Sequence, residues 1–165
     1  MIVLDAYAVL ALLKDEPAAG DVRLLLDHDE GAVLTALGVA EVIDNLIRIS
    51  GADEDEAVLD VAQLGLGSPP PVDAAVALSA GRLRARHYDR KIRAVSLADC
   101  VAAETARSAG SPLATADPHL LDMCRAEDVA LIALPDSAGQ VWTPGCTRLW
   151  LLTEGGVAPD DENGP

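Results

Sequence analysis

The chain has 165 residues, half of them hydrophobic, and a formal net charge of −15. This length is enough for a single domain with its own core, and no change of composition divides the chain in two. We expect no signal peptide or membrane span, because the N-terminal apolar run is short and the residues after Leu13 are charged. Three widely spaced cysteines without paired histidines disfavour a disulfide framework and a zinc site, so we expect a cytoplasmic protein.

Apolar patterns of strand and helix type alternate along the chain. In chain order, we predict a strand at residues 1–4, helices at 6–14 and 20–28, a strand at 32–34, helices at 36–50, 54–64, 74–87 and 96–108, a strand at 113–115, a helix at 118–125 and a strand at 129–134. Thr35 and Asp117 are expected to cap the helices that follow them. This alternation, with short connections, favours an α/β fold of three layers, α/β/α, with a central and mainly parallel sheet.

The C-terminal part of the chain has a weaker pattern. We assign residues 1–134 to one domain and residues 135–154 to an extension that docks on it through Val141-Trp142 and Leu149 to Leu152. Residues 155–165 are acidic and contain glycine and proline, a composition that predicts a disordered tail.

Four acidic residues mark the ends or turning points of short apolar phrases. They are Asp5 in MIVLD, Glu41 in TALGVAE, Asp99 in SLAD and Asp117 in LATAD. Carboxyl ends of parallel strands meet at one rim of an open α/β sheet, so these side chains are expected to gather there. Carboxylate oxygens suit hard cations such as Mg²⁺ or Mn²⁺, which also take water and substrate phosphate as ligands. The pattern therefore predicts a metal-dependent phosphodiesterase.

Each acid also has a structural interpretation. Asp117 precedes a proline and can cap a helix, Asp99 can complete a capping box with Ser96, Glu41 can face solvent, and Asp5 can begin a turn. Asp5 and Asp99, however, stand in apolar surroundings, where an unpaired ionised carboxylate is costly. Either a bound cation or a strongly raised pKa is needed there.

Half of the basic residues fall into one short window directly before Asp99. They are Arg82, Arg84, Arg86, Arg90, Lys91 and Arg93. We predict that they bind the phosphates of a nucleic acid, which offsets the unfavourable net charge of the whole chain. The alternative is a solvated helix end whose cations interact with the helix dipole.

The acidic phrases, in this order and on these elements, resemble a known family. An apolar strand ending in Asp5, a helical Glu41 followed by Asn45, SLADCVAAETA with Asp99, and LATAD with Thr115 and Asp117 are similar to PIN-domain nucleases, especially VapC-type toxin ribonucleases of bacterial toxin–antitoxin pairs. The resemblance covers roughly Met1 to Leu134. It implies cleavage of RNA that depends on magnesium or manganese, and a homodimer that a cognate antitoxin neutralises.

The resemblance also implies roles for single residues. Asp5, Glu41 and Asp99 match the three central metal-site acids of the family, and Asp117 matches the more variable fourth. Thr115 matches a hydroxyl residue that orients a carboxylate or a water. Asn45 is a candidate hydrogen-bond donor to a metal-binding carboxylate, and the favoured alternative is that it is solvated on the helix surface. His119 is a candidate for proton transfer, although a histidine on a helix surface more often has no such role.

Other classes of protein fit the sequence less well. A haloacid-dehalogenase-like phosphatase needs a second aspartate two residues after the first, where this chain has Tyr7. A receiver domain needs an acidic pair before its phosphoacceptor and a late lysine, but the only lysines are Lys14 and Lys91. The remaining alternative is a catalytically weak PIN-like module that binds RNA or protein without cleaving.

Overall fold

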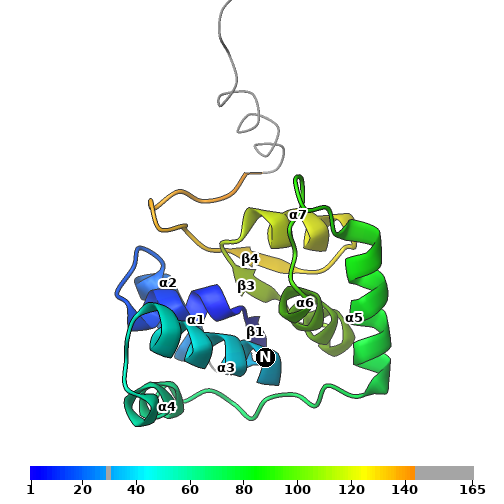
Figure 1. Ribbon diagram of the computed structural model, residues 1–165. Coiled ribbons are helices and arrows are strands. Elements are labelled where there is room, and N and C mark those ends of the chain that lie inside the picture. The colour runs from blue at the N-terminus through cyan, green and yellow to red at the C-terminus, as the bar shows by residue number, and fades with distance from the viewer. Residues whose placement is uncertain (29–30, 144–165) are drawn as a thin grey trace, which may run out of the picture.

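A four-stranded parallel sheet organises the protein, as seen in a computed structural model that describes residues 1–28 and 31–143 (Figure 1). The strands are β1 (Ile2–Leu4), β2 (Ala32–Leu34), β3 (Leu113–Thr115) and β4 (Leu131–Ala133). Their order in the sheet is β2-β1-β3-β4, and every neighbouring pair is parallel. The central strands β1 and β3 pair Val3 with Leu113 and Leu4 with Ala114. Asp5 and Thr115 therefore lie at the same end of adjacent strands.

Helices cover both faces of this sheet. They are α1 (Ala6–Leu13), α2 (Ala19–Leu26), α3 (Ala36–Asp44), the π-helical segment η1 (Asn45–Ile49), α4 (Glu54–Ala62), α5 (Ala74–His87), α6 (Leu97–Ala109) and α7 (Pro118–Ala126). Because side chains alternate along a strand, Ile2 and Leu4 pack into a core with α1 to α4, whereas Val3 packs into a second core with α5 to α7. The predicted α/β/α arrangement with a parallel sheet is confirmed.

Helix boundaries follow from local chemistry. The side chain of Thr35 accepts from the backbone N–H of Gly38, and that of Asp117 accepts from the backbone N–H of His119, so both predicted caps are present. The helix predicted at residues 36–50 differs from the structure at its C-terminal end. Its last turn widens into η1, where the N–H of Ser50 donates to the carbonyl of Asn45 five residues earlier (3.0 Å).

The two edges of the sheet differ. At the outer edge of β2, the N–H of Gly67 donates to the carbonyl of Ala32 (2.9 Å), in a bridge that pairs Gly67 with Val33. Beyond β4, residues 135–143 turn back on themselves through a bridge between Pro135 and Val141. Of the predicted extension at residues 135–154, the part from 144 to 154 with the apolar Leu149 to Leu152 lies outside the described residues, and so does the predicted tail at 155–165. In the described part of the chain, no helix is long and apolar enough to span a membrane.

Candidate active site

Asp5 is the most constrained of the predicted site residues. Its backbone N–H continues the ladder between β1 and β3 by donating to the carbonyl of Ala114 (3.0 Å). Its side chain caps α1, since Oδ1 accepts from the N–H of Ala6 (2.7 Å), while Oδ2 accepts from the hydroxyl of Thr115 (2.8 Å). Only 7% of Asp5 is exposed. Burial, and then the nearby Asp99, raise the pKa of Asp5 to about 7.

Asp99 lies in the first turn of α6 and is also buried. It forms the predicted capping box with Ser96: Oδ2 accepts from the backbone N–H of Ser96 (2.6 Å), and the Ser96 hydroxyl accepts from the N–H of Asp99 (3.0 Å). Burial raises the pKa of Asp99 against the opposing effect of these hydrogen bonds, and Asp117 raises it further. The capping box thus fixes the direction of a carboxylate that burial makes reluctant to ionise.

Glu41 and Asp117 approach the two buried aspartates from other elements. Glu41 lies on α3 and is exposed to solvent; partial loss of hydration raises its pKa, and the charges of Asp99 and Asp117 raise it further. Asp117 follows β3, where the hydroxyl of Thr115 accepts from its backbone N–H (3.0 Å). Thr115 therefore links Asp5 and Asp117 through one fully buried hydroxyl.

The four acids influence one another but do not form a closed cage. Like-charge effects connect Asp5 with Asp99 and Asp117, and Glu41 with the same two residues. Among residues 1–28 and 31–143, no group of three His, Cys, Asp or Glu side chains is arranged as it stands to hold a metal ion. Nor does any basic side chain of this region form an ion pair with one of the four acids.

The donor chemistry of this rim fits a divalent cation. All four side chains offer carboxylate oxygens, which are the ligands that Mg²⁺ and Mn²⁺ prefer. Two of them are buried without a cationic partner, and their raised pKa values show that negative charge is unfavourable there. A cation would relieve that repulsion, with water and substrate phosphate as further ligands.

Comparisons with known proteins agree with this geometry. The sequence profile of the PIN domain matches residues 2–126. The chain belongs to the PIN domain family. Similar solved structures include FitAcB from Neisseria gonorrhoeae (TM-score 0.60, 24% identity, covering 80% of this chain and 96% of that chain) and VapBC2 from Rickettsia felis, bound to a DNA fragment from its promoter (TM-score 0.60, 18% identity, 81% and 99%). VapBC-1 from nontypeable Haemophilus influenzae also resembles this chain in fold (TM-score 0.56, 19% identity, 80% and 97%). The search of curated proteins gave no match.

Two further residues of this PIN domain have contacts that bear on the site. The amide oxygen of Asn45 accepts from Nζ of Lys14 (2.8 Å) at the surface, so its hydrogen bond leads to α1 and not to a carboxylate. His119 lies close enough to Asp99 to have an electrostatic effect that lowers the pKa of that carboxyl. Within the described residues, Nδ1 of His119 is buried without a hydrogen-bond partner. The sequence reveals its proximity to Asp117 but not its approach to Asp99, which depends on how α6 and α7 pack.

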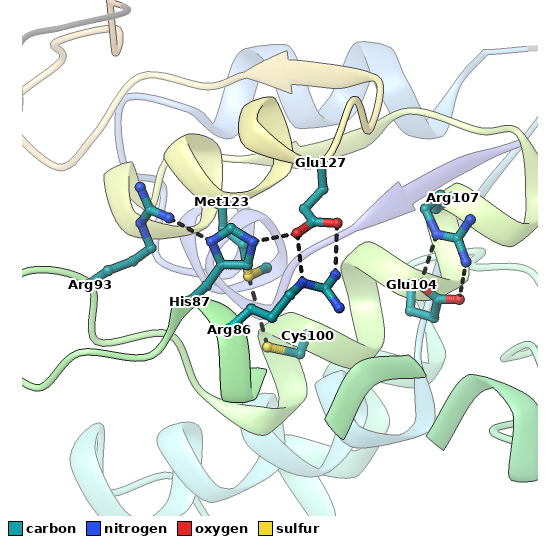
Figure 2. Close-up of polar contacts among 8 residues, drawn as sticks. All are labelled: Arg86, His87, Arg93, Cys100, Glu104, Arg107, Met123 and Glu127. Atoms are coloured by element: carbon teal, nitrogen blue, oxygen red, sulfur yellow. Dashed lines mark hydrogen bonds and ion pairs between the residues drawn. The ribbon is translucent and has the colours of Figure 1, made fainter. Parts of the chain in front are cut away.

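The basic window of this PIN domain divides into two kinds of side chain. Three of its arginines have partners within the protein. Arg84 lies over the ring of Tyr88 (4.2 Å). Arg86 binds Glu127, and Arg93 contacts His87 (Figure 2). Arg82, Arg90 and Lys91 are exposed, and their side chains make no hydrogen bond or ion pair with the described residues. Glu127, the partner of Arg86, lies at the end of α7. In the sequence it comes 34 residues after Arg93, the last residue of the window.

Proposed function

We propose that this protein is an endoribonuclease that cleaves RNA phosphodiester bonds with the help of Mg²⁺ or Mn²⁺. The observation that carries the proposal is the rim where buried Asp5 and Asp99 meet Asp117 and Glu41 without a cationic partner among the described residues. Membership of the PIN domain family supports a nuclease in particular.

We assign different roles to the residues of the rim and to the side chains that hold them. Asp5, Glu41, Asp99 and Asp117 would hold the cation, which when bound supplies activation of a water and neutralisation of charge on the leaving oxygen. The hydroxyl of Thr115 holds Asp5 and the start of α7 in a fixed relation, and Ser96 holds Asp99. No protein side chain needs to act as a nucleophile. His119, whose electrostatic effect reaches Asp99, would be the candidate for exchanging a proton with the leaving group.

The first prediction is the loss of cleavage when a buried carboxylate becomes an amide. Asp99→Asn keeps size and removes charge, so RNA cleavage in the presence of Mn²⁺ should fall at least about 100-fold, since even the hydrogen-bond partners of metal ligands commonly contribute 10–100-fold. Cleavage is measured on a broad pool of transcripts. Asp55→Asn, which removes an exposed acid of α4, is the matched control and should cleave like the wild type.

Two outcomes would contradict the proposal. Equal cleavage by Asp99→Asn and Asp55→Asn would mean that the activity does not come from this rim. No cleavage by the wild type across the pool would favour the alternative function, a PIN-like module that binds RNA or protein without catalysis.

The biological setting we propose is a toxin–antitoxin pair. The support is the resemblance of the sequence to VapC-type toxins, together with the similarity in fold to the VapBC2, VapBC-1 and FitAcB structures. A cognate antitoxin would insert an Arg or Lys side chain into the acidic rim, because a guanidinium can satisfy two carboxylate oxygens at once. The active form would be a homodimer located in the cytoplasm.

A further inference from the structure

The connection between α5 and α6 is a small ordered hairpin. Asp89 and Arg93 pair through both backbone hydrogen bonds (3.0 and 2.9 Å). Between them, the side chain of Asp89 accepts from the backbone N–H groups of Lys91 (2.8 Å) and Ile92 (3.0 Å). These bonds close a three-residue tip, Arg90-Lys91-Ile92, whose side chains are all exposed. An aspartate that bonds to the backbone two residues onward is a common way to stabilise such a turn.

The hairpin is anchored to α7 by a chain of polar contacts (Figure 2). Nη1 of Arg93 lies 2.6 Å from Nδ1 of His87, and Nε2 of His87 lies 2.5 Å from Oε1 of Glu127. A guanidinium can only donate, so Nδ1 of His87 must accept, and the ring hydrogen must therefore lie on Nε2 and point to Glu127. Arg86 binds the same carboxylate through two nitrogens (3.2 and 2.8 Å). His87 is thus the link between the hairpin and α7.

A short stretch of chain joins the anchored hairpin to the acidic rim. Its return limb runs from Arg93 through the buried Val95 to Ser96, which caps α6 and hydrogen-bonds to Asp99. Three residues extend at most about 11 Å, so Arg93 lies within that distance of the residue that fixes Asp99. Figure 1 shows this loop rising between α5 and α6 in front of α7, the helix that Asp117 caps. The hairpin is therefore tied to α6, whose first turn carries Asp99, and, through Glu127 at the C-terminal end, to α7, which Asp117 caps at the other end.

We propose that residues 89–93 form a preorganised phosphate-binding hairpin, in which Arg90 and Lys91 contact the RNA backbone and His87 positions the hairpin against α7. This inference rests on the proposed function and names the part of the basic window that meets substrate. Four other described cations, Arg23, Arg48, Arg86 and Arg107, already neutralise acids of the protein. Arg90 and Lys91 have no such partner among the described residues, so they can exchange counterions for phosphate.

The test measures binding of a fluorescently labelled single-stranded RNA of mixed sequence, in EDTA so that nothing is cleaved, at several salt concentrations. Replacing Arg90 and Lys91 with Ala should weaken binding and reduce the slope of log affinity against log salt by about 1.4, because each contact to single-stranded phosphate contributes about 0.7. The control R23A/R48A also removes two cations, but ones bound to Asp15 and Asp44, and should keep the wild-type slope.

The anchor is tested by a different change in the same assay. His87→Ala should weaken binding roughly 3- to 10-fold, because the tip must then be ordered on binding, while the slope stays as in the wild type since no cation is lost. His87→Gln should restore affinity, because its amide can both accept from Arg93 and donate to Glu127. An equal slope for R90A/K91A and R23A/R48A overturns the proposal, and so does wild-type affinity in His87→Ala.

The binding results for R90A/K91A and His87→Ala remain informative even if the protein is not a nuclease, since the assay needs no cleavage. If His87→Ala does not fold, R90A/K91A still decides the central claim, because these side chains are exposed and make no contact that the described fold depends on. A wild type that cleaves RNA while R90A/K91A binds it with an unchanged slope would reject the hairpin and leave the nuclease intact.

Discussion

Each of the three aspartates of the site uses one carboxylate oxygen to accept a backbone N–H. The donors are Ala6 for Asp5, Ser96 for Asp99 and His119 for Asp117. A carboxylate has two oxygens and about four acceptor sites, so a cap leaves capacity for a second partner. Capping a helix and lining the rim are therefore compatible roles. The backbone bond fixes the orientation of the carboxylate that a cation or a hydroxyl then meets.

Burial of Asp5 makes the metal-free protein sensitive to pH. Its pKa in the folded state is about 7, above the ordinary value of 3.8 because of burial and then the charge of Asp99. The folded state thus holds a proton that the unfolded state releases, so the associated stability is complete below about pH 3.8 and disappears as the pH rises through about 7. Burial shifts the pKa values of Asp99 and Glu41 in the same direction.

We therefore predict that the free energy of unfolding in EDTA falls between about pH 4.5 and pH 8, by on the order of a few kcal/mol, at about 1.4 kcal/mol per pKa unit. Asp5→Asn should flatten this dependence and be more stable than the wild type at the upper end. Its amide oxygen can still accept from Ala6, and the Thr115 hydroxyl can accept from its NH₂. Denaturant unfolding measures the effect, with the exposed Asp21→Asn as control. A parallel pH dependence in Asp5→Asn and the wild type would contradict the assignment.

Single residues also show where sequence reasoning stops. The acids could be found because each ends an apolar phrase, and the caps because they stand before helical patterns. The partners of the basic residues could not be found in this way. The contact between His87 and Glu127 joins the end of α5 to the end of α7, which lie 40 residues apart. Only the packing of these helices decides which cations remain available.

Short apolar runs and helix caps place most elements of the fold. Strands of three residues are recognisable here because each is wholly or mostly apolar and is followed closely by a capping residue or a turn, as in Val3-Leu4-Asp5. The widening of the helix at η1 was not predicted, since residues 36–50 keep a helical apolar pattern throughout. Within this segment, Leu46 is buried among the helices of the first core.

The approach of α3 to the sheet gives a prediction at the scale of elements. Gly38 lies one turn before Glu41, and a Cβ at this position would come within 2.6 Å of Cδ1 of Leu34. Leu34 is 1% exposed, so its side chain has no room to move. Gly38→Ala should destabilise the protein by about 1–3 kcal/mol, as overpacking does elsewhere, and should lower activity by displacing Glu41.

The control for this change is Gly81→Ala in α5, where a Cβ meets nothing within 4 Å. The same substitution should there stabilise the protein by about 0.5–1 kcal/mol, because alanine loses less backbone entropy in a helix. Thermal unfolding and cleavage of RNA are the two measurements. Gly38→Ala with the stability of the wild type would show that α3 does not rest on Leu34 as closely as described.

At the scale of the whole molecule, acidic and basic residues are concentrated in different regions of the chain. The net charge is −15, and acidic residues are found on the rim, in the first turn of α4 and in the C-terminal sequence. Half of the basic residues fall in the window from Arg82 to Arg93. Net charge alone argued against a nucleic-acid enzyme, because it averages over these regions. The clustering of basic residues in one window shows why the average charge is a poor guide to the charge of any one surface.

This distribution makes general charge screening the competing explanation for any effect of a divalent cation. If Mn²⁺ binds the rim of the folded state alone, an excess of about 100 times its dissociation constant stabilises the protein by about 2.7 kcal/mol, or roughly 5–10 °C in melting temperature. Asp99→Asn should lose most of this shift, whereas Glu54→Gln with Asp55→Asn, which removes two exposed charges of α4, should retain it. The melting temperature is followed against Mn²⁺ concentration at constant ionic strength. A shift that is the same in all three proteins would mean that Mn²⁺ only screens the surface, whereas a saturable shift lost in Asp99→Asn alone places the cation among the carboxylates.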